Sequence, residues 1–188
     1  MQRELGITHK EVGALDIRNQ CSGFLYALSV ADQFVKTGMY KNVLVVGSEM
    51  HSMGLDFTTR GRNVTVIFGD GAGAAILQPS DDPDRGILTT KLHADGTYAE
   101  KLAFINPGCH GGYHANKLGE AVDFGFPPPN TYGEIFMTPR MMEQGMYYPV
   151  MEGQFVFKFA VQKFPEVIRE ALDEAGLKSS DINLLIPH

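Results

Sequence analysis

The sequence predicts a layered α/β fold with mixed, mostly parallel sheets, and three observations lead to this prediction. Apolar runs of strand length alternate along the chain with segments whose apolar residues recur every three or four positions. The run Val43–Val46 is apolar at every position, which is typical of a strand buried on both faces of a sheet. Hydrophobic residues make up 44% of the chain, so we expect a sizeable core and no global disorder.

The first eighty residues are expected to form one helix among several strands. Apolar spacings of three and four from Phe24 to Val35 predict a helix that ends near Gly38. Apolar, β-branched or glycine-rich runs that are typical of strands lie at 14–17, 43–47, 64–68 and in the segment that ends at Leu77.

The second half is expected to hold a long insertion between a strand and two helices. Residues from about 98 to 150 hold many prolines, glycines and methionines, and we interpret them as an ordered insertion. The other expected elements are a strand at 86–93, a helix at 155–163, a second helix that restarts at Pro165 and stops at Gly176, and a strand at 184–186.

The composition excludes some classes of function. The formal charge of −6, without a basic stripe, argues against nucleic-acid binding. Only two cysteines occur, which is too few for a disulfide framework and fits a reducing cytoplasm. No apolar run approaches the roughly 20 residues that span a bilayer, and no signal peptide is evident, so we expect a cytoplasmic protein without membrane contact.

Cys21 lies at a predicted strand-to-helix junction. The first backbone N–H groups of a helix have no partner within the helix, and the helix dipole is positive there. A thiolate in that position is stabilised and becomes a usable nucleophile, and the small Ser22 and Gly23 leave room for a substrate. The position alone fits equally well a small buried apolar residue.

His188 follows the predicted strand at 184–186. The carboxyl ends of parallel strands face the region where α/β sheets bind ligands. A histidine there stabilises a developing oxyanion or transfers a proton. The position by itself fits a plain terminal residue as well.

Several motifs together resemble one family. They are Cys21–Phe24 with the helix after it, Val45–Glu49, Ile67–Ala74, Leu92–Gly96, Gly153–Lys158 and Ile186–His188. In this order they resemble β-ketoacyl-acyl carrier protein synthase III, a condensing enzyme of the thiolase superfamily. They cover most of the chain outside the insertion.

The resemblance implies a thiolase-like layered α/β/α fold, present in part. Residues 1–80 would form the latter part of the N-terminal half, and residues 81–188 the first part of the C-terminal half, with the insertion at about 98–150. The family's chains are much longer. We therefore interpret this sequence as a fragment or as one part of a split protein, and we expect it to be inactive alone.

The resemblance also implies an activity, an acyltransferase reaction that initiates fatty-acid biosynthesis. An acyl-CoA primer would acylate Cys21, and malonyl-acyl carrier protein would lose carbon dioxide and attack the acyl group. His188 falls on the catalytic histidine that assists decarboxylation. The family's catalytic asparagine has no counterpart at Asn63, Asn106 or Asn183. No cofactor is implied beyond the substrates.

Four further residues are implied to bind substrates or partners. Arg60 falls on the arginine that contacts the CoA nucleotide, and a guanidinium suits both stacking on adenine and pairing with phosphate. Gly153 is implied to bind substrate, Phe157 resembles a wall of the pantetheine channel, and Lys158 matches a position that faces the acidic carrier protein. A homodimer is implied as well. A solvated arginine, a core aromatic and a plain surface lysine are the alternatives for Arg60, Phe157 and Lys158.

Other functions stay open. The same Cys-His chemistry serves head-to-head acyl condensation, polyketide-type synthesis and hydroxymethylglutaryl-CoA synthesis, and a non-catalytic partner subunit would keep the fold. Cys109, His110 and His114 match no standard zinc spacing, so we predict no metal site. The glycines at 69–73 lack the Lys-Ser/Thr ending of a phosphate loop. The acyl chain, the extender unit and the role of the insertion are not determined by the sequence.

Overall fold

A computed structural model describes residues 1–9, 11–83, 85–104, 142–143, 145 and 147–188. The chain divides into two compact units. The first unit comprises residues 1–47, 74–90 and 185–188, and the second comprises residues 48–73 and 91–184. Both units draw on separate stretches of the chain. The division into half-domains at residue 80 stays a prediction.

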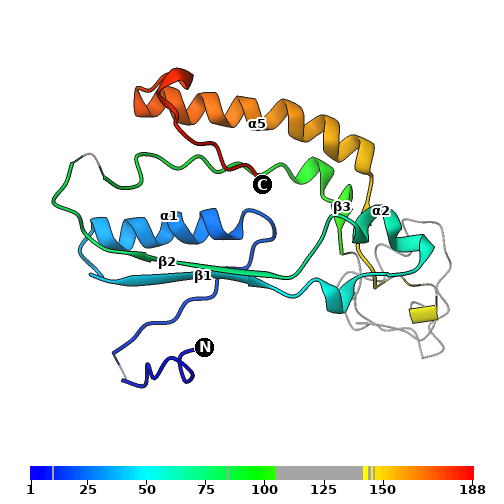
Figure 1. The fold of residues 1–188 in the computed structure, drawn as a ribbon, viewed down its shortest axis with the longest axis horizontal. Helices are drawn as coiled ribbons and strands as arrows, with labels where there is room; N and C mark the ends of the chain where they lie inside the picture. The colour runs from blue at the N-terminus through cyan, green and yellow to red at the C-terminus, as the bar shows by residue number, and fades with distance from the viewer. Residues whose placement is uncertain (10, 84, 105–141, 144, 146) are drawn as a thin grey trace, which may run out of the picture. The chain divides into compact units, whose positions relative to one another are not determined.

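Helix α1, Gly23–Lys36, lies in the first unit. Strand β1, Val43–Glu49, pairs with β2, Gly71–Leu77, and the larger part of each strand belongs to this unit (Figure 1). The predicted helix is confirmed, and it ends at Lys36 with Thr37 as its C-cap, before Gly38 with its positive φ of 73°. Helix α1 packs on β1 at Gly47, where a Cβ would lie 3.1 Å from the Phe24 ring. A larger residue at Gly47 would therefore push α1 away from the strand.

The second unit contains short helices and a two-residue strand pair. Two 3₁₀ turns, Ser52–Gly54 and Thr59–Gly61, precede α2, Arg62–Thr65. Strand β3, Leu102–Ala103, pairs antiparallel with β4, Val150–Met151. This pairing places the two ends of the predicted insertion side by side, whereas most of the insertion itself, 105–141, lies outside the described residues.

Helix α5 runs without a break from Gly153 to Ala175. The predicted restart at Pro165 is wrong, because the proline lies inside a single 23-residue helix. The predicted stop is confirmed, since Gly176 adopts a left-handed conformation with φ 67°. The first turns of α5 pack on the 3₁₀ turn Gly96–Tyr98, with the Tyr98 ring 4.8 Å from that of Phe155.

Several predicted strands do not form. Residues 14–17, 86–93 and 184–186 are irregular, and 64–68 are replaced by the end of α2 and a turn. An apolar run becomes a strand only beside a partner that pairs its N–H and C=O groups, and the described residues place none beside these runs. In β1, Val45 is buried but Leu44 is 43% exposed, so the expected burial on both faces is also wrong.

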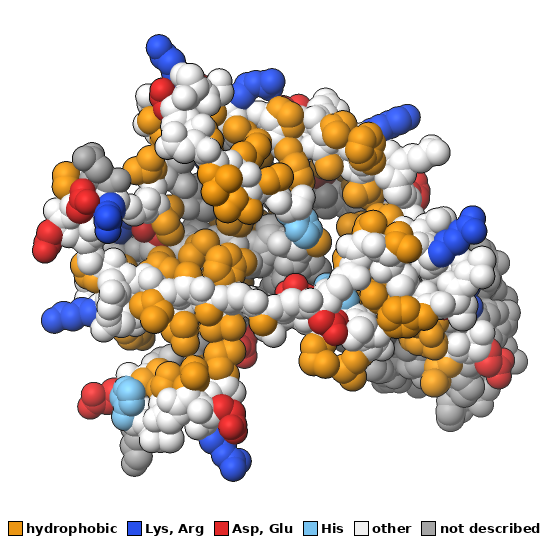
Figure 2. Space-filling view, viewed as in Figure 1, with side chains coloured by type: hydrophobic (Ala, Val, Ile, Leu, Met, Phe, Trp, Pro, Cys, Tyr) orange, Lys and Arg blue, Asp and Glu red, His pale blue; other side chains and the backbone are white. Residues whose placement is uncertain are grey.

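The core of the described residues is small. Its buried apolar side chains are Ala31, Val45, Leu55 and Val64. Figure 2 shows hydrophobic side chains gathered on the visible face, and large apolar residues such as Leu15, Ile76 and Ile186 are more than half exposed. None of the helices in the described part of the chain is long and apolar enough to cross a membrane.

Candidate functional site

Cys21 lies at the start of α1 in the first unit. Its thiol is free and exposed, and it directly precedes the N-cap residue Ser22. A turn closed by the Gly23 N–H and the Gln20 carbonyl oxygen, 2.9 Å apart, brings the chain into the helix here. Ser22 makes no side-chain capping bond, and the first turn contains no acidic residue. The thiol therefore lies at the positive end of a 14-residue helix without a competing carboxylate in that turn.

His188 belongs to the first unit as well. Residues 185–188 cluster with the segment that carries Cys21 and α1, although they form no strand. The His188 side chain is exposed. The structure therefore assigns both predicted catalytic residues to one compact unit, and their catalytic roles stay predictions.

Arg60 lies in the second unit, in the 3₁₀ turn Thr59–Gly61. Its Nε donates to Oδ2 of Asp56 at 2.5 Å, and its side chain is 55% exposed while that of Asp56 is 3% exposed. Hydrogen bonding to Asp56 raises the pKa of Arg60 above its ordinary value. The guanidinium is thus accessible at the surface, but a buried carboxylate fixes its inner edge.

Asp56 is the centre of a small hydrogen-bond network. The backbone N–H and the hydroxyl of Thr58 donate to Oδ1 of Asp56 at 3.0 Å and 2.6 Å, and the Thr65 hydroxyl donates to its carbonyl oxygen at 2.8 Å. The Thr58 hydroxyl, followed by Arg60, lowers the pKa of Asp56 below its ordinary value. Asp56 is not among the residues predicted from the sequence. Its signal was the spacing Asp56-x-Thr58-x-Arg60, in which an Asp accepts from the backbone two residues on.

An aromatic pair adjoins Arg60. The guanidinium carbon lies 5.3 Å from the centre of the Tyr148 ring. The Tyr147 hydroxyl donates to that of Tyr148 at 3.0 Å, which raises the pKa of Tyr148. Gly145 has a φ of 67°, and a Cβ there would lie 2.5 Å from the guanidinium carbon of Arg60. These three residues lie in the stretch that the sequence analysis treated as insertion.

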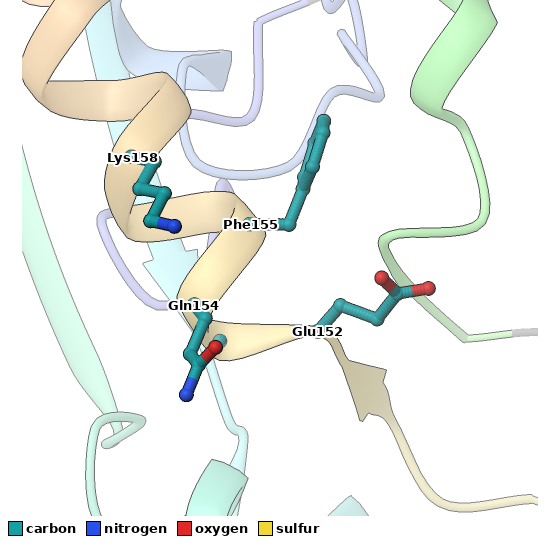
Figure 3. Close-up of a pocket in the computed structure, with 5 residues that line it drawn as sticks. Glu152, Gln154, Phe155 and Lys158 are labelled. Atoms are coloured by element: carbon teal, nitrogen blue, oxygen red, sulfur yellow. The ribbon is translucent and has the colours of Figure 1, made fainter.

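A pocket of about 470 Å³ lies at the start of α5. Its lining residues are Glu152, Gly153, Gln154, Phe155 and Lys158. Figure 3 shows Gln154 and Lys158 on one side of the helix start and Glu152 and Phe155 on the other. The Glu152 carboxylate accepts from Lys101 Nζ at 2.6 Å.

The pocket includes two of the three residues near the start of α5 that were predicted to bind substrates or the carrier protein. Gly153 and Lys158 line it, whereas Phe157 is 68% exposed and is not among the lining residues. Phe155, which the sequence analysis did not single out, supplies the aromatic wall. The binding roles of Gly153, Phe157 and Lys158 stay predictions.

The possible metal ligands, Asn106 and the glycine-rich segment add no residue to the candidate site. Cys109, His110 and His114 lie outside the described residues, as does Asn106. Within the ranges that the structure describes, no three His, Cys, Asp or Glu side chains group as a metal site would require. The glycine-rich segment leads into β2 at Gly71 and opens no helix, unlike a phosphate loop.

The chain is similar in sequence and in fold to proteins of one family. A sequence model of the 3-oxoacyl-[acyl-carrier-protein] synthase III family matches residues 15–96, a span that contains Cys21 and Arg60. The crystal structure of 3-oxoacyl-[acyl-carrier-protein] synthase III from Aquifex aeolicus VF5 is 35% identical, with a TM-score of 0.71 over 100% of this chain.

The chain is thus similar to synthase III over its whole length. Further synthase III structures are similar. That from Thermus thermophilus is 30% identical with a TM-score of 0.69 over 97% of this chain, and that from Pseudomonas aeruginosa PAO1 is 27% identical with a TM-score of 0.63 over 89%. The predicted layered α/β fold of the thiolase type is thereby confirmed. The chain spans 46%, 46% and 41% of the length of these three synthase III structures.

Proposed function

We propose that this chain is part of an acyltransferase that condenses an acyl-CoA primer with malonyl-acyl carrier protein, the step that initiates fatty-acid biosynthesis. The observation that carries the proposal is the exposed thiol of Cys21 at the N-terminus of α1, inside the span that matches the synthase III family. An exposed thiol at the positive end of a helix is a suitable nucleophile for an acyl thioester.

The first half-reaction is transfer of the acyl group to Cys21. The thiolate attacks the carbonyl carbon of the acyl-CoA, and a carbon–sulfur bond to Cys21 forms as the bond to the CoA sulfur breaks. The CoA thiolate leaves and takes up a proton. Backbone N–H groups at the start of α1 would stabilise the negative charge that develops on the carbonyl oxygen.

The second half-reaction forms the carbon–carbon bond. Malonyl-acyl carrier protein loses carbon dioxide, and the resulting carbanion attacks the carbonyl carbon of the acyl-Cys21 thioester. The bond to Cys21 breaks, the β-ketoacyl product stays on the carrier protein, and the thiolate returns. His188 would donate a hydrogen bond to the thioester oxygen of the malonyl group, which stabilises the enolate formed on decarboxylation.

The binding residues divide between the two substrates in this proposal. Arg60, exposed and held at its inner edge by Asp56, would contact the nucleotide of CoA. Gly153 and Lys158, together with the neighbouring Phe157, would receive pantetheine and the acidic carrier protein at the start of α5. We further propose that the protein acts as a homodimer in the cytoplasm and needs no cofactor besides its substrates.

Intact-mass spectrometry tests the proposal. The natural polypeptide that carries this sequence is incubated with a mixture of acyl-CoA thioesters, beside its Cys21→Ser and Cys109→Ser variants. We expect a mass gain of one acyl group in the parent and in Cys109→Ser, and none in Cys21→Ser. Cys109 is the matched control because it is the other cysteine of the chain.

The acyl group that is gained names the preferred primer. A gain that survives Cys21→Ser would contradict the assigned nucleophile. A folded parent that gains no acyl group from any donor would favour a non-catalytic partner subunit, and condensation with a non-malonyl acceptor would favour a related Cys-His condensing reaction.

A further inference from the structure

The surroundings of Arg60 hold more contacts than the proposed contact with the CoA nucleotide by itself explains. Asp56 is the one charged side chain among the buried residues that the structure describes, at 3% exposure. A buried carboxylate is costly unless its hydrogen bonds are satisfied. Here Thr58 donates to one oxygen, and Arg60 donates to the other at 2.5 Å.

The bond to Asp56 determines how the guanidinium lies. Because Nε is the donor, the planar group is held at the edge nearest its own backbone. With Nε held in this way, Arg60 offers a flat face of fixed orientation, on which a planar base stacks.

Tyr148 fixes the same guanidinium from a distant part of the chain. Its ring lies 5.3 Å from the guanidinium carbon, within the range of a cation–π contact. Gly145 leaves no room for a side chain beside the guanidinium. Three contacts from residues 56, 145 and 148 therefore restrict one exposed arginine, which is more than a solvated loop arginine receives.

We propose that Asp56 and Tyr148 are positioning residues that hold the Arg60 guanidinium in one plane for the nucleotide end of a coenzyme A thioester. The proposal rests on the proposed function for the identity of the ligand. A side chain as long as arginine loses rotamer freedom when it binds, and fixing it beforehand lowers that cost. Gly145 and Tyr148, which lie within the predicted insertion, thereby contribute to recognition of the acyl donor.

Two acyl donors and one fragment of coenzyme A distinguish the positioning role of Asp56 and Tyr148 from a role in catalysis. Acylation of Cys21 is followed with acyl-CoA and with acyl-pantetheine, which lacks the nucleotide. Binding of adenosine 3′,5′-bisphosphate, the nucleotide end of CoA, is measured by calorimetry and needs no reaction. All measurements use the natural polypeptide that carries this sequence, and melting temperatures report whether each variant folds.

For Asp56→Asn we expect KM for acyl-CoA to rise roughly tenfold, since a hydrogen bond to a charged group is lost. The maximal acylation rate and the reaction with acyl-pantetheine should stay unchanged, and nucleotide binding should weaken by a similar factor. Tyr148→Leu should act in the same direction. Tyr148→Phe keeps the aromatic ring, so its KM and its nucleotide affinity should match those of the parent. The comparison of Tyr148→Leu with Tyr148→Phe therefore remains informative if Asp56→Asn does not fold.

The outcomes distinguish the two proposals. Equal losses with both donors, or no change in Asp56→Asn and Tyr148→Leu, would overturn the positioning role and leave the acylation of Cys21 untouched. A parent that is acylated but does not bind the nucleotide would also overturn it. If nucleotide binding depends on Asp56 and Tyr148 in a chain that is never acylated, this result would support the positioning role and contradict the proposed activity.

Discussion

At the scale of single residues, the loop around Asp56 depends on a close backbone approach. The Asp56 carbonyl oxygen accepts from the Thr65 hydroxyl, and the chain returns past it at Gly61. A Cβ at Gly61 would overlap that carbonyl oxygen and lie 2.5 Å from the Asp56 Cβ. The absence of a side chain at Gly61 is therefore what lets the 56–65 loop close.

Gly61→Ala is expected to destabilise the fold by about 1–3 kcal/mol, because the added methyl overpacks a site that contacts backbone. Gly69→Ala is the matched control, since a Cβ at Gly69 meets nothing within 4 Å. Urea unfolding of the two variants measures the difference. Equal stability of Gly61→Ala and Gly69→Ala would show that the loop does not close as described.

At the scale of secondary-structure elements, α5 continues through a residue that disfavours helices. Pro165 has no N–H to donate and its ring clashes with the carbonyl four residues earlier. The helix survives because its start packs on Tyr98 and its end is capped by Gly176. Lys163 and Glu166, paired at 2.6 Å, flank the proline.

Pro165→Ala is expected to raise the free energy of unfolding by up to about 3 kcal/mol, the usual cost of proline in a helix interior. Gln162→Ala, an exposed position on the same helix, should change it little. Thermal unfolding followed by circular dichroism compares them. A loss of stability in Pro165→Ala would mean that the proline ring makes packing contacts worth more than the missing hydrogen bond.

At the scale of the whole molecule, more large apolar side chains are exposed than buried among the residues that the structure describes. Leu184, Leu185 and Ile186 are 74%, 60% and 82% exposed, and Leu88 is 63% exposed. A monomeric protein seldom leaves contiguous apolar surface of this kind uncovered. Such surface is typical of an interface with other protein.

The 188-residue chain, produced by itself, is therefore expected to bind the dye 8-anilinonaphthalene-1-sulfonate and to associate as its concentration rises. Fluorescence titration and sedimentation velocity measure the two effects. The same chain in concentrated urea is the control and should lose the dye signal. A monomer without dye binding would show that these side chains pack on one another in solution.

The agreement between sequence and structure depends on whether a signal is local. The helix that ends before Gly38 and the stop at Gly176 were both predicted, because helix periodicity and a left-handed glycine act within a few residues. The strands expected at 14–17 and 184–186 do not form, because a strand needs a partner that a local run does not specify.

The residues of the candidate site also differ in whether a local sequence signal predicts them. Cys21 at the start of a helix was predictable, since both the helix and its first residue are read from neighbouring positions. Asp56 lay unnoticed in a polar stretch, and Tyr148 lay in the presumed insertion. Asp56 lies four positions before Arg60, whereas Tyr148 lies eighty-eight positions after it. No short motif reveals a contact across the longer separation.

Residue order and short-range periodicity were enough to predict the resemblance to synthase III, the α/β class, the helix that follows Cys21 and the stop at Gly176. Only the tertiary structure decided the continuity of α5 through Pro165, the burial of Asp56 and the meeting of Arg60 with Tyr148. The reason is physical. Burial and long-range contact depend on which surfaces pack together, and packing compensates for unfavourable local preferences such as proline in a helix.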